Sequence, residues 1–147
     1  MAVVVVDRDE VKPVGGSVRV SHVKAKSAIT QGQPVTKDAT TRDYFPSVND
    51  TVANVDTDGF ALTPAPLAGD YFLMLNLGGS SVIFLGTGVL DTAAGVQEGV
   101  PFCVGDAAGD IVPYADLGAA DEVKLLGVSS SASELDTNLN NIKDIIL

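Results

Sequence analysis

The residue types that carry out most protein chemistry are scarce in this sequence. The chain of 147 residues holds one histidine, His22, and one cysteine, Cys103. A disulfide framework, a Cys/His zinc site and an iron–sulfur cluster within one chain are therefore excluded. Cys103 lies between Phe102 and Val104 with no base beside it, which predicts a small buried thiol. A Ser-His-Asp triad would depend on His22, which sits in an alternating strand pattern, so we expect no enzymatic activity.

Two short motifs bear on ligand chemistry. The run Asn54-Val-Asp-Thr-Asp-Gly59 matches the opening of a calcium loop, with oxygen donors at loop positions 1, 3 and 5 and glycine at position 6. Position 12 should supply a bidentate glutamate but is Ala65, so the run is either a tight surface turn or an adventitious calcium site. Gly86-Thr-Gly88 lacks the third glycine of a dinucleotide fingerprint, and the sequence predicts no nucleotide or other cofactor.

Charge is distributed unevenly along the chain. The formal net charge is -10, yet residues 1–42 carry seven of the nine bases against four acids, and the remaining residues are strongly acidic. An acidic body repels phosphate backbones and anionic lipid headgroups, so we expect neither nucleic acid nor a membrane as a partner. The candidate partner-binding residues are the bases at the start of the chain, Arg8, Lys12, Arg19, Lys24 and Lys26.

The elements that must position these residues are predicted to be strands. Hydrophobic residues make up 46% of the chain and charged residues 19%, with 15 glycines and 7 prolines as punctuation, a composition typical of a turn-rich β protein. Short alternating or apolar runs recur, for example at 17–23, 71–77 and 82–85. The sequence therefore predicts an all-β fold, either a small β-barrel or a β-sandwich.

Two parts of the chain differ in character. Residues 1–27 are either an N-terminal arm that lies on an acidic neighbour or an edge strand of the protein's own sheet. Residues 28–147 are expected to form a single β-rich domain. Within that domain, residues 37–70 are poor in apolar side chains and contain three prolines, which predicts a loop-rich insertion with one short strand at Phe60–Thr63.

Residues 71–90 contain no charged side chain over a length that could span a membrane. The centre of this run is Gly78-Gly-Ser-Ser81 and its flanks are Asp70 and Asp91, which favours a buried β-hairpin over a membrane helix. The apolar run Val3–Val6 is too short for a signal peptide. We therefore expect a protein that is made and assembled in a cytoplasm.

One helix is predicted near the end of the sequence, because Ser131 and Glu134 have capping-box spacing. Apolar side chains follow at helical intervals, at Leu135, Leu139, Ile142 and Ile146. The asparagines and aspartates between them are weak helix formers, so a short or irregular C-terminal helix is as compatible as a full one. The run Ile145-Ile-Leu147 docks either on the protein's own core or in a neighbouring subunit.

A short pattern occurs twice, as Gln31-Gly-Gln-Pro-Val-Thr36 and, 67 residues later, as Glu98-Gly-Val-Pro-Phe-Cys103. Each copy places glycine at a turn and proline at the first residue of a predicted strand, where no backbone donor is needed. The match is either a coincidence between common β-protein turns or the trace of a repeat.

The most specific patterns lie in the second half, at Glu98-Gly-Val-Pro-Phe-Cys-Val-Gly-Asp106, Gly109-Asp-Ile-Val-Pro-Tyr114 and Lys124-Leu-Leu-Gly-Val-Ser129. They resemble the small β domain of head-decoration, or capsid cement, proteins of tailed bacteriophages. The resemblance covers roughly residues 94–130, with a fainter match at Ala28–Thr36. The segments 37–70 and Leu135–Leu147 have no counterpart in that pattern.

The resemblance implies a non-enzymatic homo-trimer that binds across neighbouring major capsid subunits and so decorates and stabilises the exterior of a virion. It also implies that the N-terminal arm pairs with the shell. The alternatives are a non-catalytic ligand-binding β module and a tail or fibre component. A concave aromatic or polar pocket would favour the ligand-binding module, because capsid reinforcement does not require one.

Overall fold

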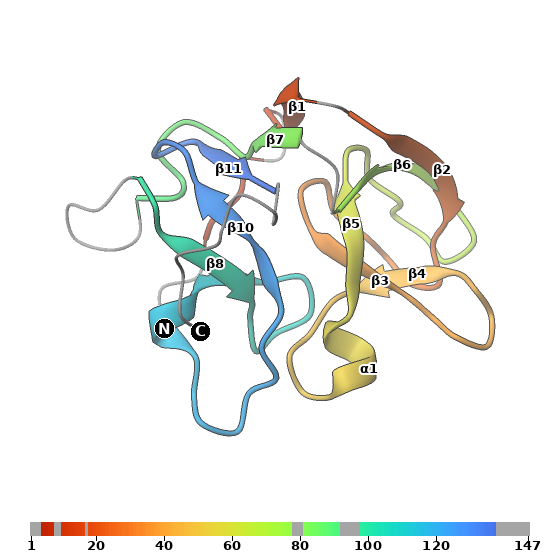
Figure 1. The fold of residues 1–147 in the computed structure, drawn as a ribbon. Coiled ribbons are helices and arrows are strands. Elements are labelled where there is room, and N and C mark those ends of the chain that lie inside the picture. Colours follow the sequence, from red (N-terminus) through yellow and green to blue (C-terminus); the bar gives the residue numbers. More distant parts are fainter. Residues whose placement is uncertain (1–3, 8–9, 17, 78–80, 92–97, 138–147) are drawn as a thin grey trace.

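Two antiparallel β-sheets form the molecule in the computed structural model, which describes residues 4–7, 10–16, 18–77, 81–91 and 98–137 (Figure 1). In chain order the elements are β1 (Lys12–Gly16), β2 (Val20–Lys24), β3 (Pro34–Lys37), β4 (Tyr44–Pro46), α1 (Val52–Val55), β5 (Thr57–Ala61), β6 (Tyr71–Asn76), β7 (Ser81–Phe84), β8 (Pro101–Val104), β9 (Ile111–Pro113), the 3-10 turn η1 (Tyr114–Asp116), β10 (Leu125–Ser129) and β11 (Glu134–Asp136).

A shared hydrophobic core joins the two sheets. Phe60 and Leu75 enter it from the five-stranded sheet, and Ile83, Phe102 and Leu135 enter it from the six-stranded sheet; each of these side chains is almost fully buried. The all-β prediction is confirmed. Of the two architectures considered, the sandwich is the one observed, because neither sheet closes into a barrel.

The two sheets repeat one strand topology. Strands β2 to β6 have the spatial order β2-β6-β5-β3-β4, and strands β7 to β11 have the corresponding order β7-β11-β10-β8-β9, with β1 added beside β7. We call residues 20–76 the first unit and residues 81–136 the second unit. In Figure 1 the first unit lies on the right, and β8, β10 and β11 of the second unit lie on the left.

The pairing register shows that the units correspond position by position. Pro34 opens β3 opposite β5, and Pro101 opens β8 opposite β10, and in both pairs the register shifts within the next residues. The hairpin strand that follows ends in Pro46 in the first unit and in Pro113 in the second. Each of these prolines pairs with the second residue of the preceding strand, so the correspondence extends well beyond the two glycine–proline motifs.

Left-handed backbone conformations recur at the same spacing. Gly32 and Gly99 have φ values of 88° and 74°, each two residues before the strand-opening proline. Arg42 and Gly109 have φ values of 63° and 81° in the two hairpin loops. A left-handed backbone conformation is thus required at the same loop position in both units, although arginine adopts this conformation less readily than glycine. The two sequence motifs therefore belong to a structural repeat.

The segment 37–70, predicted to be a loop-rich insertion, contains β4, α1 and β5. Strand β5 pairs on both sides, with β3 and with β6, and it lies in the middle of the first unit. Its residues Phe60 and Ala61 are fully buried. The shortage of apolar residues was misleading because a strand of five residues with a central glycine needs few large side chains to fill its place in the core.

The predicted hairpin at 71–90 is wrong in its pairing, although both strands exist. Strand β6 pairs with β2 and β5, whereas β7 pairs with β1 and β11 in the other sheet. Strands β6 and β7, although consecutive in the chain, thus belong to different sheets. Among the described residues, no helix is long and apolar enough to cross a lipid bilayer.

The predicted helix at Ser131 is also wrong, because Glu134–Asp136 is strand β11. The Ser131 hydroxyl does accept the expected local hydrogen bonds, from the N–H groups of Ser133 and Glu134. The chain then enters a strand because Leu135 is fully buried between β7 and β10. Residues 138–147, which include the remainder of the predicted helix, lie outside the described residues.

Candidate functional site

The predicted partner-binding bases come from several segments of the chain. Arg8 lies outside the described residues. The Nζ atom of Lys12, in β1, lies 5.5 Å from the centre of the Phe84 ring. Arg19 and Lys24 are exposed, one just before β2 and one at its end. Of the four described bases, these two flank the same strand.

The described residues between Val4 and Lys24 pack on the body of the protein. Val4 and Val11 are buried in the core that joins the two sheets. The Val4 N–H donates to the Ile111 carbonyl, at 2.8 Å, and β1 pairs with β7. Of the two interpretations of the N-terminal segment, the edge strand agrees with the structure. Strand β1 lies at the edge of one sheet and β2 at the edge of the other.

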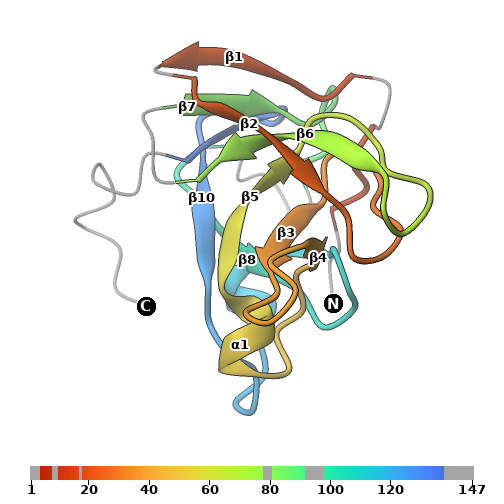
Figure 2. The ribbon, with the colours of Figure 1, turned by 90° about the vertical axis from the view of Figure 1, so that its right-hand side faces the viewer.

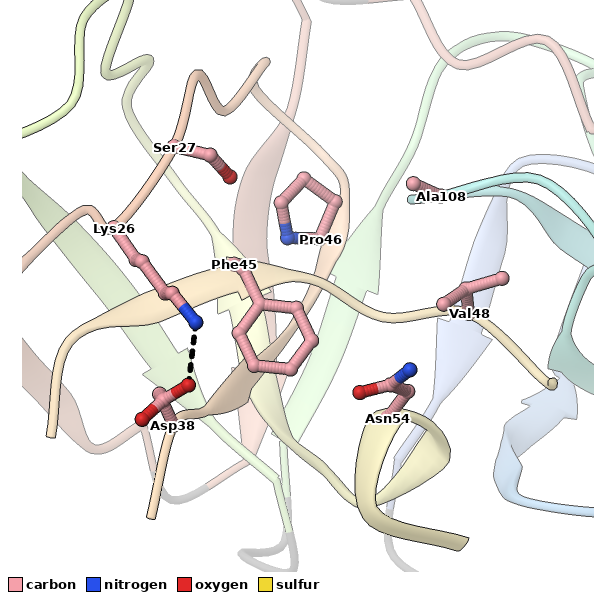
Figure 3. Close-up of a pocket in the computed structure, with 8 residues that line it drawn as sticks. All are labelled: Lys26, Ser27, Asp38, Phe45, Pro46, Val48, Asn54 and Ala108. Carbon is pink, nitrogen blue, oxygen red and sulfur yellow. Dashed lines mark hydrogen bonds and ion pairs between the residues drawn. The ribbon is translucent and has the colours of Figure 1, made fainter. Parts of the chain in front are cut away.

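A hollow of about 410 Å³ lies beside β4 and has one of the predicted bases, Lys26, in its wall (Figure 3). Its walls come from the segment after β2, the β3–β4 hairpin, α1 and the β8–β9 loop. The lining residues are Lys26, Ser27, Asp38, Phe45, Pro46, Val48, Asn54 and Ala108. This site is the concavity that a ligand-binding module would require.

The charged groups of this hollow bind one another. The Lys26 ammonium donates to Asp38 and lies 5.6 Å from the centre of the Phe45 ring. Asp38 also accepts hydrogen bonds from the N–H groups of Thr40 and Thr41. The hydrogen bond from Lys26, followed by those from the two backbone donors, holds the pKa of Asp38 far below its usual range. Lys26 is thereby engaged within the protein and is a poor candidate for steering a partner.

The calcium interpretation of Asn54–Gly59 is contradicted by the local structure. Asn54 belongs to α1 and Gly59 to β5, so these residues do not form a loop. The Asp56 carboxylate lies 3.6 Å from the Lys124 ammonium, and the Asp58 carboxylate accepts a hydrogen bond from the Lys37 N–H. The surface-turn interpretation fails for the same reason. No cluster of three metal-ligating side chains occurs in the part of the chain that the structure describes.

The outer face of β2 and β6 carries exposed apolar side chains, only part of which the sequence pattern indicates. Val20, Tyr71 and Leu73 are 46%, 61% and 40% exposed, respectively. His22 lies directly opposite Leu73, and its ring centre is 5.1 Å from that of Tyr71. The sequence predicts a buried hairpin strand here because the run from Tyr71 to Leu75 is apolar throughout and hides the alternation. Of its side chains, only those of Phe72, Met74 and Leu75 are buried.

Cys103 is fully buried in β8, as its apolar neighbours predicted. Burial raises the pKa of its thiol to about 12, because a thiolate in an apolar surrounding has lost its hydration. The proton is therefore held far more tightly than in an exposed cysteine, and the side chain acts as a small apolar group of the core.

Replacing Cys103 by serine is expected to lower the free energy of unfolding by about 1–3 kcal/mol, because a hydroxyl is costlier to bury than a thiol. The raised pKa also predicts a pH effect. The protonated Cys103 thiol makes its full stabilising contribution below the unfolded pKa of 9.0. This contribution declines as the pH rises toward the folded pKa of about 12. Denaturant unfolding at several alkaline pH values should show this decline in the native protein and a smaller one in Cys103→Ser. Rapid reaction of the folded protein with a thiol reagent at pH 8 would contradict the assignment.

Comparisons with known proteins return no match: no family model, curated protein or solved structure is significantly similar to this chain.

Proposed function

We propose that the protein is a non-enzymatic structural component of a virion, which decorates a tailed-phage capsid by binding across neighbouring major capsid subunits. The observation that carries the proposal is the repeat. The glycine–proline motif, on which the resemblance to capsid cement proteins depends, opens β3 and β8 at equivalent positions of two units with one topology. The glycine–proline motif of the strong match and that of the faint match thus occupy equivalent positions in the two units.

A two-unit sandwich suits a protein that reinforces a shell. Two similar units joined by a common core present two related surfaces in a fixed orientation, so that each can contact a different capsid subunit. Each contact adds interface across a boundary that internal pressure would separate, and the linked contacts reinforce one another through a high effective concentration. Major capsid protein is the expected partner, and a homo-trimer the expected assembled form.

Shells that lack the protein should bind it when the two are mixed and sedimented together. Binding is expected to saturate and to raise the melting temperature of the shell. Arg19→Gln combined with Lys24→Gln should slow association at low salt, because exposed charges act mainly on the encounter rate. Lys26→Gln is the matched control with little expected effect, since that ammonium is engaged with Asp38. A full-length protein that stays in the supernatant at all salt concentrations would contradict the proposal.

The hollow beside Lys26 is the observation that favours the alternative, a ligand-binding β module. Its single aromatic wall, Phe45, offers a flat surface on which a ring could stack. A screen of monosaccharides and disaccharides by thermal shift, repeated with Phe45→Ala, tests this alternative. A stabilisation that disappears in Phe45→Ala would favour it over capsid decoration.

A further inference from the structure

Three of the four sheet edges are blunted within the described chain. Strands β4 and β9 end in Pro46 and Pro113, which have no backbone N–H to offer a neighbour. Both edges are also crossed by another segment: the Tyr44 carbonyl accepts from Lys26, and the Ile111 carbonyl accepts from Val4. At the third edge, β1 contains a proline and a register shift. Prolines, shifts and covering segments are the usual means of preventing edge-to-edge pairing.

The fourth edge, β2, lacks these protections along Val20–Lys24, and β4 contacts the chain only from Ala25 onward. It contains neither proline nor glycine and pairs with β6 in continuous register. The backbone hydrogen bonds at Arg19 and Ala25 go to the β6 side. Because bonded and non-bonded pairs alternate in an antiparallel ladder, the N–H and C=O groups of Val20, His22 and Lys24 point away from β6. Apart from β4, whose Tyr44 forms an isolated bridge with Ala25 just beyond the end of β2, no described strand pairs with that side (Figure 2).

The repeat shows what an edge of this kind accepts. In the second unit the equivalent of β2 is β7, and its outer edge is covered by β1 in antiparallel pairing. The first unit lacks such a strand. Beside its open edge the exposed face is apolar and basic, with Val18, Val20 and Leu73 flanked by Arg19 and Lys24. The first unit is therefore one strand short of the arrangement that the second unit completes.

We propose that the open edge of β2 accepts the segment 138–147 of a second copy of this chain as an added antiparallel strand. This segment alternates apolar and acidic residues at Ile142, Asp144 and Ile146, so that all three can lie on one face of a strand. The apolar pair matches the exposed valines of the edge, and the carboxylate matches its flanking cations. Its length exceeds the five residues of β2.

The point at which the segment leaves the fold favours another copy as the donor. Thr137 is buried and makes two hydrogen bonds to the Ser81 carbonyl, through its N–H and its hydroxyl. Ser81 also pairs with Gly16, the last residue of β1, and β2 begins at Val20. A segment from the same copy would therefore reach β2 at Val20 and run parallel to it. All strand pairs of both sheets are antiparallel. A segment from a second copy can approach β2 from its Lys24 end and so run antiparallel to it.

Each copy then donates one strand and accepts one, which is a head-to-tail contact that closes into a ring. Light scattering of the full chain should give three times the mass of 15.1 kDa, the trimer proposed above. His22→Pro removes an outward N–H without touching the bonds to β6 and should give a monomer. His22→Ala keeps that N–H and should remain a trimer. Ile146→Asp, which damages the donated strand, should also give a monomer.

Mixing the two monomeric variants provides the decisive measurement. His22→Pro retains an intact donor segment and Ile146→Asp an intact edge, so an equimolar mixture should form a complex of twice the chain mass. A synthetic peptide of residues 138–147 in excess should dissociate the native ring. Val20→Lys, which places a charge on the same edge, is the replacement variant if His22→Pro does not fold.

Three results would overturn the proposal: a monomeric native chain at every concentration, a trimer that persists in Val20→Lys and His22→Pro, or variants that do not complement one another. None of these measurements involves a capsid. Failure of strand exchange therefore leaves the proposed shell binding untouched, and failure of shell binding leaves strand exchange untouched.

Discussion

Deleting residues 1–16 should destabilise the whole protein by about 5 kcal/mol and lower its melting temperature by about 10–20 °C. The deletion removes two core side chains, Val4 and Val11, each of which contributes about 1.5–3 kcal/mol through burial. It also exposes the edge of β7 and leaves the Ile111 carbonyl without its donor. A loss of this size is a large part of the 5–15 kcal/mol that stabilises a typical domain.

Point variants separate core packing from mere shortening of the chain. Val4→Ala combined with Val11→Ala should reproduce a large part of the loss in denaturant unfolding. Val5→Ala is the matched control, because that neighbouring side chain is 79% exposed, and it should change stability by less than about 0.5 kcal/mol. A deletion variant that melts with the native protein would instead restore the interpretation of this segment as an independent arm.

Alanine at either of two glycines, Gly59 or Gly127, should cost about 3 kcal/mol by overpacking. A Cβ on Gly59 would collide with the Leu75 carbonyl, and a Cβ on Gly127 would collide with the Asp136 carbonyl. Both oxygens belong to the backbone of the adjacent strand, so the clash is relieved only by separating β5 from β6 or β10 from β11. The two positions are equivalent in the repeat, and we expect similar losses in thermal unfolding.

Gly15→Ala is the control for these variants. A Cβ there meets no atom within 4 Å, and the residue lies in a strand as the other two do. Its substitution should leave stability unchanged or raise it by up to about 1 kcal/mol, because alanine narrows the unfolded ensemble. Equal melting temperatures for Gly15→Ala, Gly59→Ala and Gly127→Ala would mean that the strands are not packed as described.

Local sequence patterns predicted the strands but not their partners. The alternation at 17–23 and the apolar runs at 71–77 and 82–85 each overlap a strand of the structure, because periodicity reports which residues face a core. Pairing depends on the repeat, of which only the motif around Gly32 and Gly99 remained visible in sequence. The other equivalent positions, such as Arg42 and Gly109, differ in residue type and are recognisable only from the backbone.

The sequence indicated candidate site residues by their type. It did not indicate whether their charged groups are already bound to other groups of the same chain. Lys26 and Asp38 are twelve residues apart in sequence, and only the β3–β4 hairpin brings the carboxylate to the ammonium. Ser131 shows a related limit. Its hydroxyl makes the local hydrogen bonds of a helix cap, yet burial of Leu135 between two strands determines that a strand follows. Tertiary packing outweighs local propensity at such a site.

The position of β1 has a consequence for synthesis on the ribosome. Strand β1 is made first, but its partner β7 follows some seventy residues later, since Lys12 lies opposite Phe84. The first unit is complete once residue 76 has emerged, and chains fold from the N-terminus as they are made. During that interval β1 is unpaired and is joined by a short link to β2, whose outer edge is open. The proline and glycines of β1 weaken it as a strand and so limit premature pairing with this neighbour, which keeps the nascent chain competent until the second unit arrives.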